Sequence, residues 1–183
     1  MSLGEARAMR SAAFVKPADG KIFEPKVYPD GESLPTDRHV DASILVLKSG
    51  IMDFRLEVRC FVRDRQLVTL SPYWRDGDLA QDLEGDWPFL DEEEVAARGF
   101  AELVLGDPRI EFPPGCTLDV GRCSDGRWAV IEANPCWGAG LYGCDPNEVL
   151  KTIPHAIVRK SAVSDEHRAW ISKRRQDLLS TDG

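Results

Sequence analysis

Apolar and polar residues alternate most clearly near the middle of the chain. From Phe54 to Val62, apolar side chains occupy every second position and most of the others are charged, which predicts a half-buried strand. The pair Asp64-Arg65 predicts a turn into a second strand that begins at Gln66. Shorter apolar runs predict two earlier strands, at 13–16 and 44–47.

Three helices are predicted from their end signals. The first spans 91–105, with Asp91 as N-cap, three early glutamates and Gly106 as its end. Its apolar positions are Val95, Phe100, Leu103 and Val104. Asp145 followed by Pro146 predicts the start of the second helix, and Ser164 the start of the third.

The stretch from Cys116 to Pro135 predicts a β-hairpin. Asp125-Gly126 lies between two alternating runs, and such a pair favours a two-residue type I′ turn. This turn sets the register of the two strands. The facing pairs would be Ser124 with Arg127, Val120 with Ile131, and Asp119 with Glu132.

The hairpin also predicts a cation site. Side chains directly opposed on two strands lie about 5 Å apart at Cβ, so the like charges of Asp119 and Glu132 repel unless a cation lies between them. Asn134 projects from the same face as Glu132. Two carboxylates and an amide oxygen suit Mg²⁺. The alternative is that Arg122, Arg127 or a lysine neutralises the pair.

Composition and charge exclude several classes of protein. With 183 residues and 43% hydrophobic side chains, the chain can form one substantial core or two small subdomains that share a cleft. The net charge of -8 argues against a nucleic-acid partner. No apolar run approaches the roughly 20 residues of a membrane span, and no signal peptide is evident. The five cysteines include no Cys-x-x-Cys, which indicates reduced thiols and a cytoplasmic protein.

Several basic residues are candidates for binding phosphate. Lys16 ends an apolar strand and Lys21 follows a turn, although each alone could be a solvated surface charge. Arg59 could bind phosphate through two hydrogen bonds or form a salt bridge with Glu57 or Asp53. Arg75 is a weaker candidate, because a structural stacking role explains it equally well.

The glycines of 138–143 match Gly-x-Gly-x-x-Gly, the fingerprint of dinucleotide-binding folds. That fold needs further parallel strands, whereas the chain after Gly143 is predicted to be almost wholly helical, so we reject it. The glycines either form a loop whose backbone amides approach substrate or phosphate, or make a tight turn between strand and helix. We expect no reactive thiolate at the nearby Cys136.

Taken together, these motifs resemble the nucleotide-binding half of the ATP-grasp superfamily, over roughly 13–150. The resemblance rests on Phe14-Val15-Lys16-Pro17, on the strand with Glu57 and Arg59, and above all on Leu118-Asp119-Val120 with Ile131-Glu132-Ala133-Asn134-Pro135. It implies an α+β fold in which two subdomains with mainly antiparallel sheets enclose a nucleotide cleft. We expect the first subdomain, in part, at 11–48, the second at 49–160, and a C-terminal helix at 161–183.

The resemblance also implies cofactors and roles. ATP would be bound together with Mg²⁺, which Asp119, Glu132 and Asn134 would hold. Lys16 and Lys21 would contact the nucleotide phosphates, and Lys21 and Arg59 would be catalytic, with Arg59 stabilising the transferring group. The backbone of a hinge, at Val46, Leu47 and Lys48, would hold adenine.

The activity so implied is ATP-dependent ligation of a carboxylate to an amine or peptide through an acylphosphate. Two alternatives remain, a non-catalytic ATP-binding or regulatory module and a small-molecule kinase. The first is favoured because the chain begins close to its first lysine strand, whereas members of the superfamily usually carry a preceding domain. The sequence leaves open whether the chain forms a homodimer.

Overall fold

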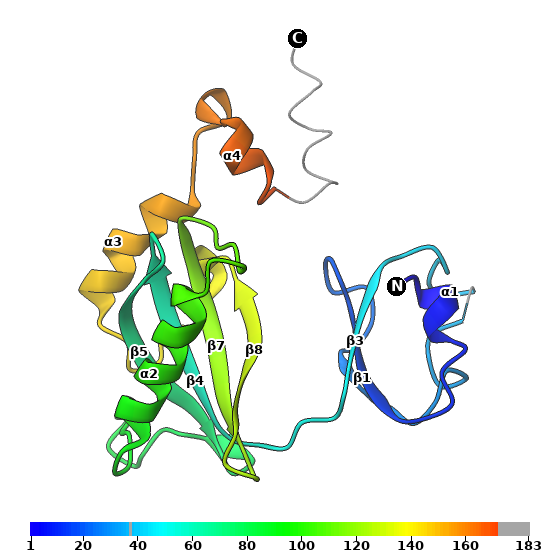
Figure 1. The fold of residues 1–183 in the computed structure, drawn as a ribbon, viewed down its shortest axis with the longest axis horizontal. Coiled ribbons are helices and arrows are strands. Elements are labelled where there is room, and N and C mark those ends of the chain that lie inside the picture. Colours follow the sequence, from blue (N-terminus) through cyan, green and yellow to red (C-terminus); the bar gives the residue numbers. More distant parts are fainter. Residues whose placement is uncertain (37, 172–183) are drawn as a thin grey trace. The chain divides into compact units, whose positions relative to one another are not determined.

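A computed structural model describes residues 1–36 and 38–171, and the chain divides into two compact units, Met1–Met52 and Asp53–Gly183 (Figure 1). Both units combine helices with antiparallel strands, which confirms the predicted α+β class. The predicted C-terminal helix over 161–183 lies outside the described residues from 172 onward.

The first unit contains a three-stranded antiparallel sheet in the order β2-β1-β3. Its elements are α1 (Leu3–Ala6), β1 (Ala13–Pro17), β2 (Lys26–Tyr28) and β3 (Val46–Ser49). One face of the sheet packs with α1 into a small core that includes Leu3, Val15 and Val46. The strand predicted at 44–47 therefore begins two residues later and continues to Ser49.

The second unit contains a five-stranded antiparallel sheet in the order β6-β5-β4-β7-β8. Its strands are β4 (Phe54–Arg63), β5 (Gln66–Arg75), β6 (Asp78–Leu79), β7 (Gly115–Cys123) and β8 (Trp128–Asn134). The predicted turn between β4 and β5 is confirmed, because Arg63 pairs with Gln66 and both turn residues have positive φ. Strand β5 is twice as long as predicted and ends at Arg75.

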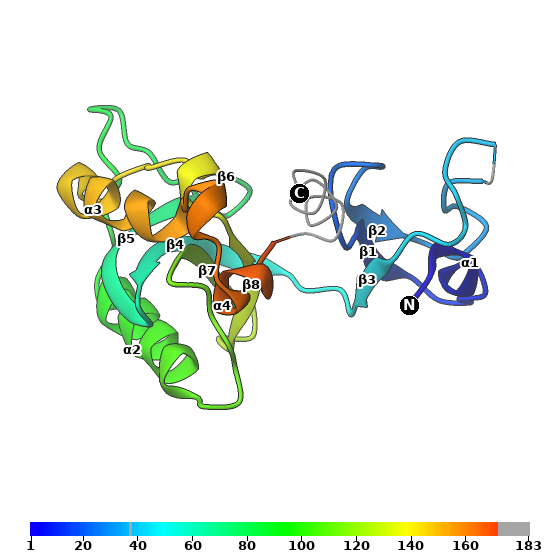
Figure 2. The same cartoon turned by 90° about the horizontal axis from the view of Figure 1, so that it is seen from above.

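Helices cover both faces of the five-stranded sheet, with α2 (Glu93–Gly106) on one side and α3 (Pro146–Ala156) on the other (Figures 1 and 2). The main core lies under α2 and includes Leu56, Val58 and Val120. A smaller cluster on the opposite face joins Phe61 to residues of α3 and of the short helix η1 (Cys136–Gly138). Strand β4 is therefore covered on both faces over part of its length, not on one as its alternation predicted.

Helix α2 begins later than predicted. Asp91 has a φ of +45°, Glu92 occupies the N-cap position without a side-chain hydrogen bond, and Glu93 accepts a hydrogen bond from the Leu90 N–H at 3.0 Å. Two of its predicted apolar positions are exposed. The residues that it buries are Glu93, Ala97, Ala101, Val104 and Leu105.

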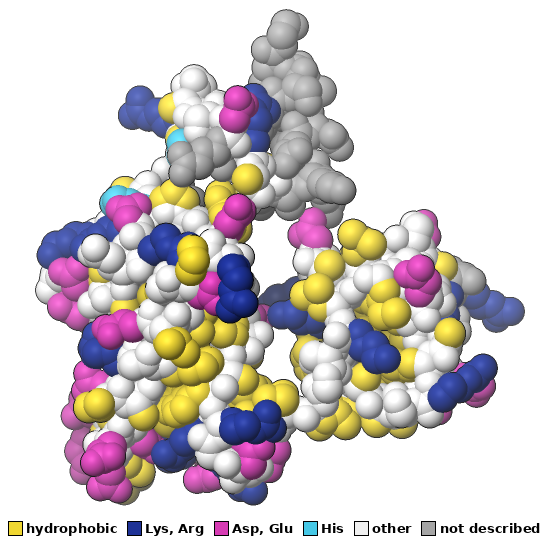
Figure 3. Space-filling view, viewed as in Figure 1, with side chains coloured by type: hydrophobic (Ala, Val, Ile, Leu, Met, Phe, Trp, Pro, Cys, Tyr) yellow, Lys and Arg dark blue, Asp and Glu magenta, His cyan; other side chains and the backbone are white. Residues whose placement is uncertain are grey.

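The other two predicted helix starts are confirmed. Asp145 caps α3 by accepting a hydrogen bond from the Asn147 N–H, and Ser164 caps α4 (Asp165–Arg168), which follows the short helix η2 (Lys160–Ala162). In the part of the chain that the structure describes, no helix has the length and apolar character to cross a membrane. On the face drawn in Figure 3, acidic and basic side chains of the second unit are interspersed.

Candidate functional site

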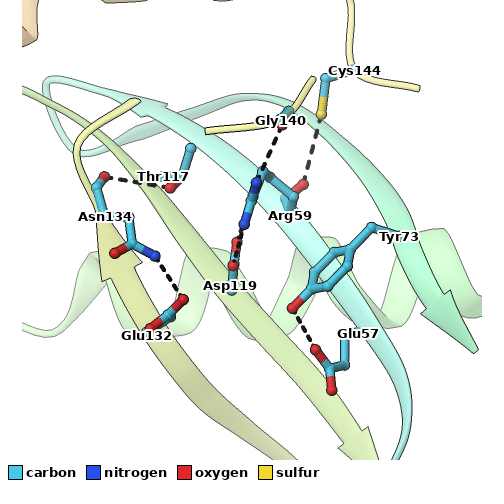
Figure 4. A network of polar contacts seen from close by, with 9 residues as sticks. All are labelled: Glu57, Arg59, Tyr73, Thr117, Asp119, Glu132, Asn134, Gly140 and Cys144. Atoms are coloured by element: carbon cyan, nitrogen blue, oxygen red, sulfur yellow. Dashed lines mark hydrogen bonds and ion pairs between the residues drawn. The ribbon is translucent and has the colours of Figure 1, made fainter. Parts of the chain in front are cut away.

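Four polar residues from four strands form a row across the face of the sheet opposite α2. Strand pairing places Ser71 of β5 beside Arg59 of β4, Arg59 beside Asp119 of β7, and Asp119 beside Glu132 of β8. Because the residues next to Arg59 and Asp119 along β4 and β7 are buried under α2, this polar row points to the other face (Figure 4). Residues distant in sequence thus come together through strand register alone.

The hairpin of β7 and β8 has a longer turn than predicted. The Cys123 N–H donates to the Arg127 carbonyl at 2.8 Å, so the loop consists of three residues, 124–126. Gly126 has a φ of +84°, as expected for a loop that ends on a left-handed residue. The predicted pairing of Ser124 with Arg127 is therefore wrong.

This longer turn shifts the register of the adjoining strand segments by one residue, and Val120 lies opposite Val130, not Ile131. An irregularity between Asp119 and Val120 reverses the shift. Asp119 consequently faces Glu132, as predicted. The facing carboxylates depend on this irregularity as well as on the turn.

Arg59 and Asp119 form a buried ion pair at the centre of the polar row. Nε of Arg59 donates to Oδ1 at 3.0 Å, Nη2 donates to Oδ2 at 2.6 Å, and the two side chains are 10% and 1% exposed. Burial raises the pKa of Asp119 above its ordinary value, and the hydrogen bonds and charge of Arg59 oppose this rise. Burial alone would lower the pKa of Arg59, but the hydrogen bonds and charge of Asp119 outweigh it, so Arg59 stays protonated.

The partner of Asp119 is thus none of the residues expected to neutralise the acidic pair as an alternative to metal. Arg122 contacts Glu93, and Arg127 contacts Asp125 beside the turn. Nor does Arg59 form an ion pair with Glu57 or Asp53, the alternative to phosphate binding. Its partner lies 60 residues away along the chain.

Glu132 and Asn134 are joined by a hydrogen bond from the Asn134 amide nitrogen to Oε1 of Glu132, at 2.8 Å. The amide oxygen of Asn134 points away from that carboxylate (Figure 4). The three predicted magnesium ligands therefore lie on two adjacent strands, with Asp119 bound to Arg59 and Glu132 bound to Asn134.

The donors in this set could hold Mg²⁺. Within residues 1–36 and 38–171, no three His, Cys, Asp or Glu side chains are placed to hold a metal, so a site here would depend on the amide oxygen. Each carboxylate oxygen has two lone pairs, so Asp119 keeps acceptor capacity beyond its bonds to Arg59. The charge of Glu132 also contributes to raising the pKa of Asp119, and a bound cation would relieve that repulsion.

Aromatic side chains surround Arg59 on the β5 side of the row. The rings of Tyr73 and Tyr142 stack with centroids 5.0 Å apart, and the guanidinium carbon of Arg59 lies 5.3 and 5.1 Å from them. Trp87 meets Tyr142 edge to face, also at 5.0 Å. The Tyr73 hydroxyl donates a hydrogen bond to Glu57, two residues before Arg59 (Figure 4). Sequence reasoning missed this lining because β5 was predicted to end before Tyr73.

The glycine-containing segment after β8 is held against β4 and β5 by hydrogen bonds. The Gly140 carbonyl accepts from Nη1 of Arg59 at 3.3 Å, and the Gly143 N–H donates to Oγ of Ser71 at 2.9 Å. The Gly143 amide, expected to approach substrate or phosphate, thus binds the protein itself. No strand follows β8 among the described residues, in agreement with the rejection of a dinucleotide-binding fold.

Two weaker candidates have structural surroundings. Arg75 donates to Glu93 at 2.6 Å and to the Pro88 carbonyl at 3.1 Å, so its charge is used inside the second unit. Cys136 is buried, and burial raises the pKa of its thiol, which agrees with the expectation that it is not a thiolate.

The remaining predicted residues belong to the first unit. Lys16 is half-buried on β1 opposite Leu47 of β3, and Lys21 is exposed between β1 and β2. The Val46 side chain is 2% exposed, and its backbone N–H donates to the Met1 carbonyl at 2.9 Å, so Val46 is not available as predicted. Because alternate residues of a strand present their backbone groups to the same edge, Lys48 faces the outer edge of β3, away from β1.

Comparison with known families gives a match over residues 1–152 to a family described as an ATP-grasp domain, the second family of its clade. Among curated proteins nothing matches the chain.

Solved structures give distant similarities. The chain is similar to the ATP-grasp ligase PsnB complexed with a minimal precursor, with 15% identity and a TM-score of 0.44 over 79% of this chain and 48% of that one. It is similar to N5-carboxyaminoimidazole synthetase from Staphylococcus aureus complexed with ADP, with 16% identity and a TM-score of 0.40 over 68% and 33%. For D-cycloserine synthetase DcsG the values are 20% and 0.39 over 83% and 54%. The chain thus spans between a third and just over half of these structures.

Proposed function

Because this chain belongs to the ATP-grasp family, we propose that it is an ATP-dependent ligase that joins a carboxylate to an amine. The observation that carries the proposal is the polar row, in which strand register assembles Arg59, Asp119 and Glu132 on one face of the sheet. Phosphoryl transfer requires alignment and charge stabilisation more than covalent participation by the protein, and charged side chains on paired strands can supply both.

In this proposal the first unit binds the nucleotide. Lys16 and Lys21 contact its phosphates, as point charges at the end of β1 and in the segment that follows. The backbone of Lys48, on the outer edge of β3, pairs with the adenine edge. Val46 is excluded from that role by its contact with Met1, and Leu47 pairs with Lys16.

Asp119, Glu132 and Asn134 would hold Mg²⁺, whose chemistry is to neutralise the phosphate oxygens. Arg59 would bind an oxygen of the group that is transferred. Tyr73 and Tyr142, whose rings flank the guanidinium, and the Gly140 carbonyl keep Arg59 in place. A fixed donor aimed at developing negative charge typically accounts for a factor of about 100 to 1,000 in rate.

The reaction would proceed in two steps. A carboxylate oxygen of the first substrate attacks the γ-phosphorus of ATP, ADP leaves, and an acylphosphate forms. The amine nitrogen of the second substrate, a small molecule or a peptide, then attacks the acyl carbon and releases phosphate. The five buried, unpaired cysteines fit a reducing compartment such as the cytoplasm.

The test is to incubate the chain with Mg·ATP and pools of carboxylic acids and amines, and to follow ADP, phosphate and coupled products. Turnover that requires both pools supports a ligase. Phosphorylated product without phosphate release indicates a kinase, and nucleotide binding without turnover a regulatory module. Arg59→Lys should lower turnover at least about 100-fold because it removes the two-pronged donor. The matched change Arg127→Lys, at the exposed turn, should leave turnover unchanged.

A further inference from the structure

Glu57 lies next to the residues assigned to ATP chemistry but has no part in it. It precedes Arg59 by two positions on β4 and lies on the same face, opposite Gly121 of β7. The side chain is half-buried and accepts a hydrogen bond from the Tyr73 hydroxyl. Glu57 therefore lies on the polar face of the second unit, between the polar row and the aromatic rings.

The charge of Glu57 lacks a counterion inside the protein. No basic side chain among the described residues forms an ion pair with it, and the printed hydrogen bonds of Arg59 go to Asp119 and to the Gly140 carbonyl. Burial raises the pKa of Glu57, and the charges of Asp119 and Glu132 add to the rise while the Tyr73 hydroxyl opposes it. A cationic group of a ligand would relieve this desolvated negative charge.

The surroundings of Glu57 favour an ammonium group over a metal ion. Tyr73 and Tyr142 present stacked aromatic rings, and Trp87 adds a third ring at their edge. Aromatic faces attract organic cations, whereas a hard metal ion needs several oxygen ligands. Arg59, already within 5.3 Å of both tyrosine ring centroids, shows that a cation is accommodated here.

Resting on the proposed function, we propose that Glu57 binds the ammonium group of the acceptor amine and accepts its proton, with Tyr73 orienting the carboxylate. The acceptor is accordingly a primary amine that is protonated in solution. One N–H proton passes to Glu57, and the freed electron pair on nitrogen attacks the acyl carbon. The bond from that carbon to the phosphate oxygen breaks, a second N–H proton leaves with the phosphate, and Glu57 returns its proton to water.

The test separates activation of the carboxylate from attack by the amine. The full chain is given Mg·ATP and a mixture of N-acetylated amino acids, which carry carboxylates but no amine. The acceptor is either a mixture of amino acid amides, which are largely protonated at pH 7, or hydroxylamine, which is largely neutral there. Amide and hydroxamate products are measured by mass spectrometry for the wild type, for Glu57→Gln and for Glu102→Gln. Glu102 is exposed on α2, which covers the opposite face of the sheet, so it matches the change in charge.

In Glu57→Gln, the ratio of amide to hydroxamate should fall by about 100-fold, the usual contribution of a general base. Glutamine keeps an oxygen that can accept from Tyr73, so folding should be preserved, and urea unfolding checks this. Glu102→Gln should leave the ratio unchanged. An unaltered ratio in Glu57→Gln, including one in which both products fall together, would overturn the role of Glu57 while leaving the ligase intact. If the wild type forms neither product, the proposed function fails, and the role of Glu57 with it.

Discussion

Replacing Asp119 by asparagine should destabilise the second unit strongly. The substitution keeps the shape of the side chain but removes the charge that balances Arg59. Because both side chains are almost fully buried, water cannot replace the lost partner. The expected result is therefore a large fall in the free energy of unfolding, even though no volume is lost.

The size of the fall can be worked from the pair itself. Charge centres about 4 Å apart attract by about 4 kcal/mol at an effective dielectric constant of about 20. The asparagine oxygen keeps one hydrogen bond to Arg59, worth about 1 kcal/mol. The difference, about 3 kcal/mol, agrees with the roughly 3 to 5 kcal/mol lost when one partner of a buried ion pair is removed.

Urea unfolding followed by tryptophan fluorescence measures this loss in the right unit. All five tryptophans belong to the second unit: Trp74, Trp87, Trp128, Trp137 and Trp170. The control is Asp125→Asn, which removes a charge from an exposed pair with Arg127 and should change the free energy of unfolding by less than about 1 kcal/mol.

A second variant tests the physical reason. Replacing both partners by apolar residues, in Arg59→Met with Asp119→Leu, leaves no unbalanced charge and should recover most of the lost stability. If Asp119→Asn costs no more than Asp125→Asn, or if the double variant is less stable than the single one, the explanation by an uncompensated buried charge is refuted.

Three further predictions concern stability. Gly121→Ala should lower the free energy of unfolding by about 1–3 kcal/mol, because its Cβ would lie 2.4 Å from the Phe54 ring. Gly99→Ala in α2, with nothing within 4 Å, should raise it by about 0.5–1 kcal/mol, and calorimetry distinguishes the two. Asp145→Ala removes the cap of α3 and should cost about 1 kcal/mol, with faster amide exchange in the first turn. Glu57→Gln should stabilise the protein at pH 8. The raised pKa of Glu57 means that the folded state binds its proton more tightly than the unfolded chain does, so the penalty removed is largest above the folded pKa. The gain measured in urea should shrink as the pH falls toward the ordinary pKa of glutamate, and a gain independent of pH would contradict this.

Local signals in the sequence correctly predicted features that depend on a few neighbouring residues. The turn at Asp64-Arg65 and the cap at Asp145 are confirmed, because backbone geometry and capping hydrogen bonds involve residues close in the chain. The opposition of Asp119 and Glu132 is also correct. It follows from pairing across a short hairpin, although a longer turn and a compensating irregularity produce it.

The family resemblance, carried by the same short motifs, is likewise confirmed. The start of α2 was predicted wrongly for a non-local reason. Glu93, which is buried there, contacts Arg75 and Arg122 on two strands of the sheet, and these contacts form only when the helix packs on it. An N-cap preference of about 1 kcal/mol at Asp91 is smaller than such packing and ion-pair energies.

The tertiary structure alone decided how the charges of the candidate site are paired. Arg59 meets Asp119 because β4 and β7 are neighbours in the sheet, although α2 and its flanking loops separate them in sequence. The same packing removes Asp119 from water and leaves Glu57 with a tyrosine in place of a cation. Residue type and spacing fix which side chains share a face, whereas burial and partners depend on contacts between distant strands, which local preferences do not encode.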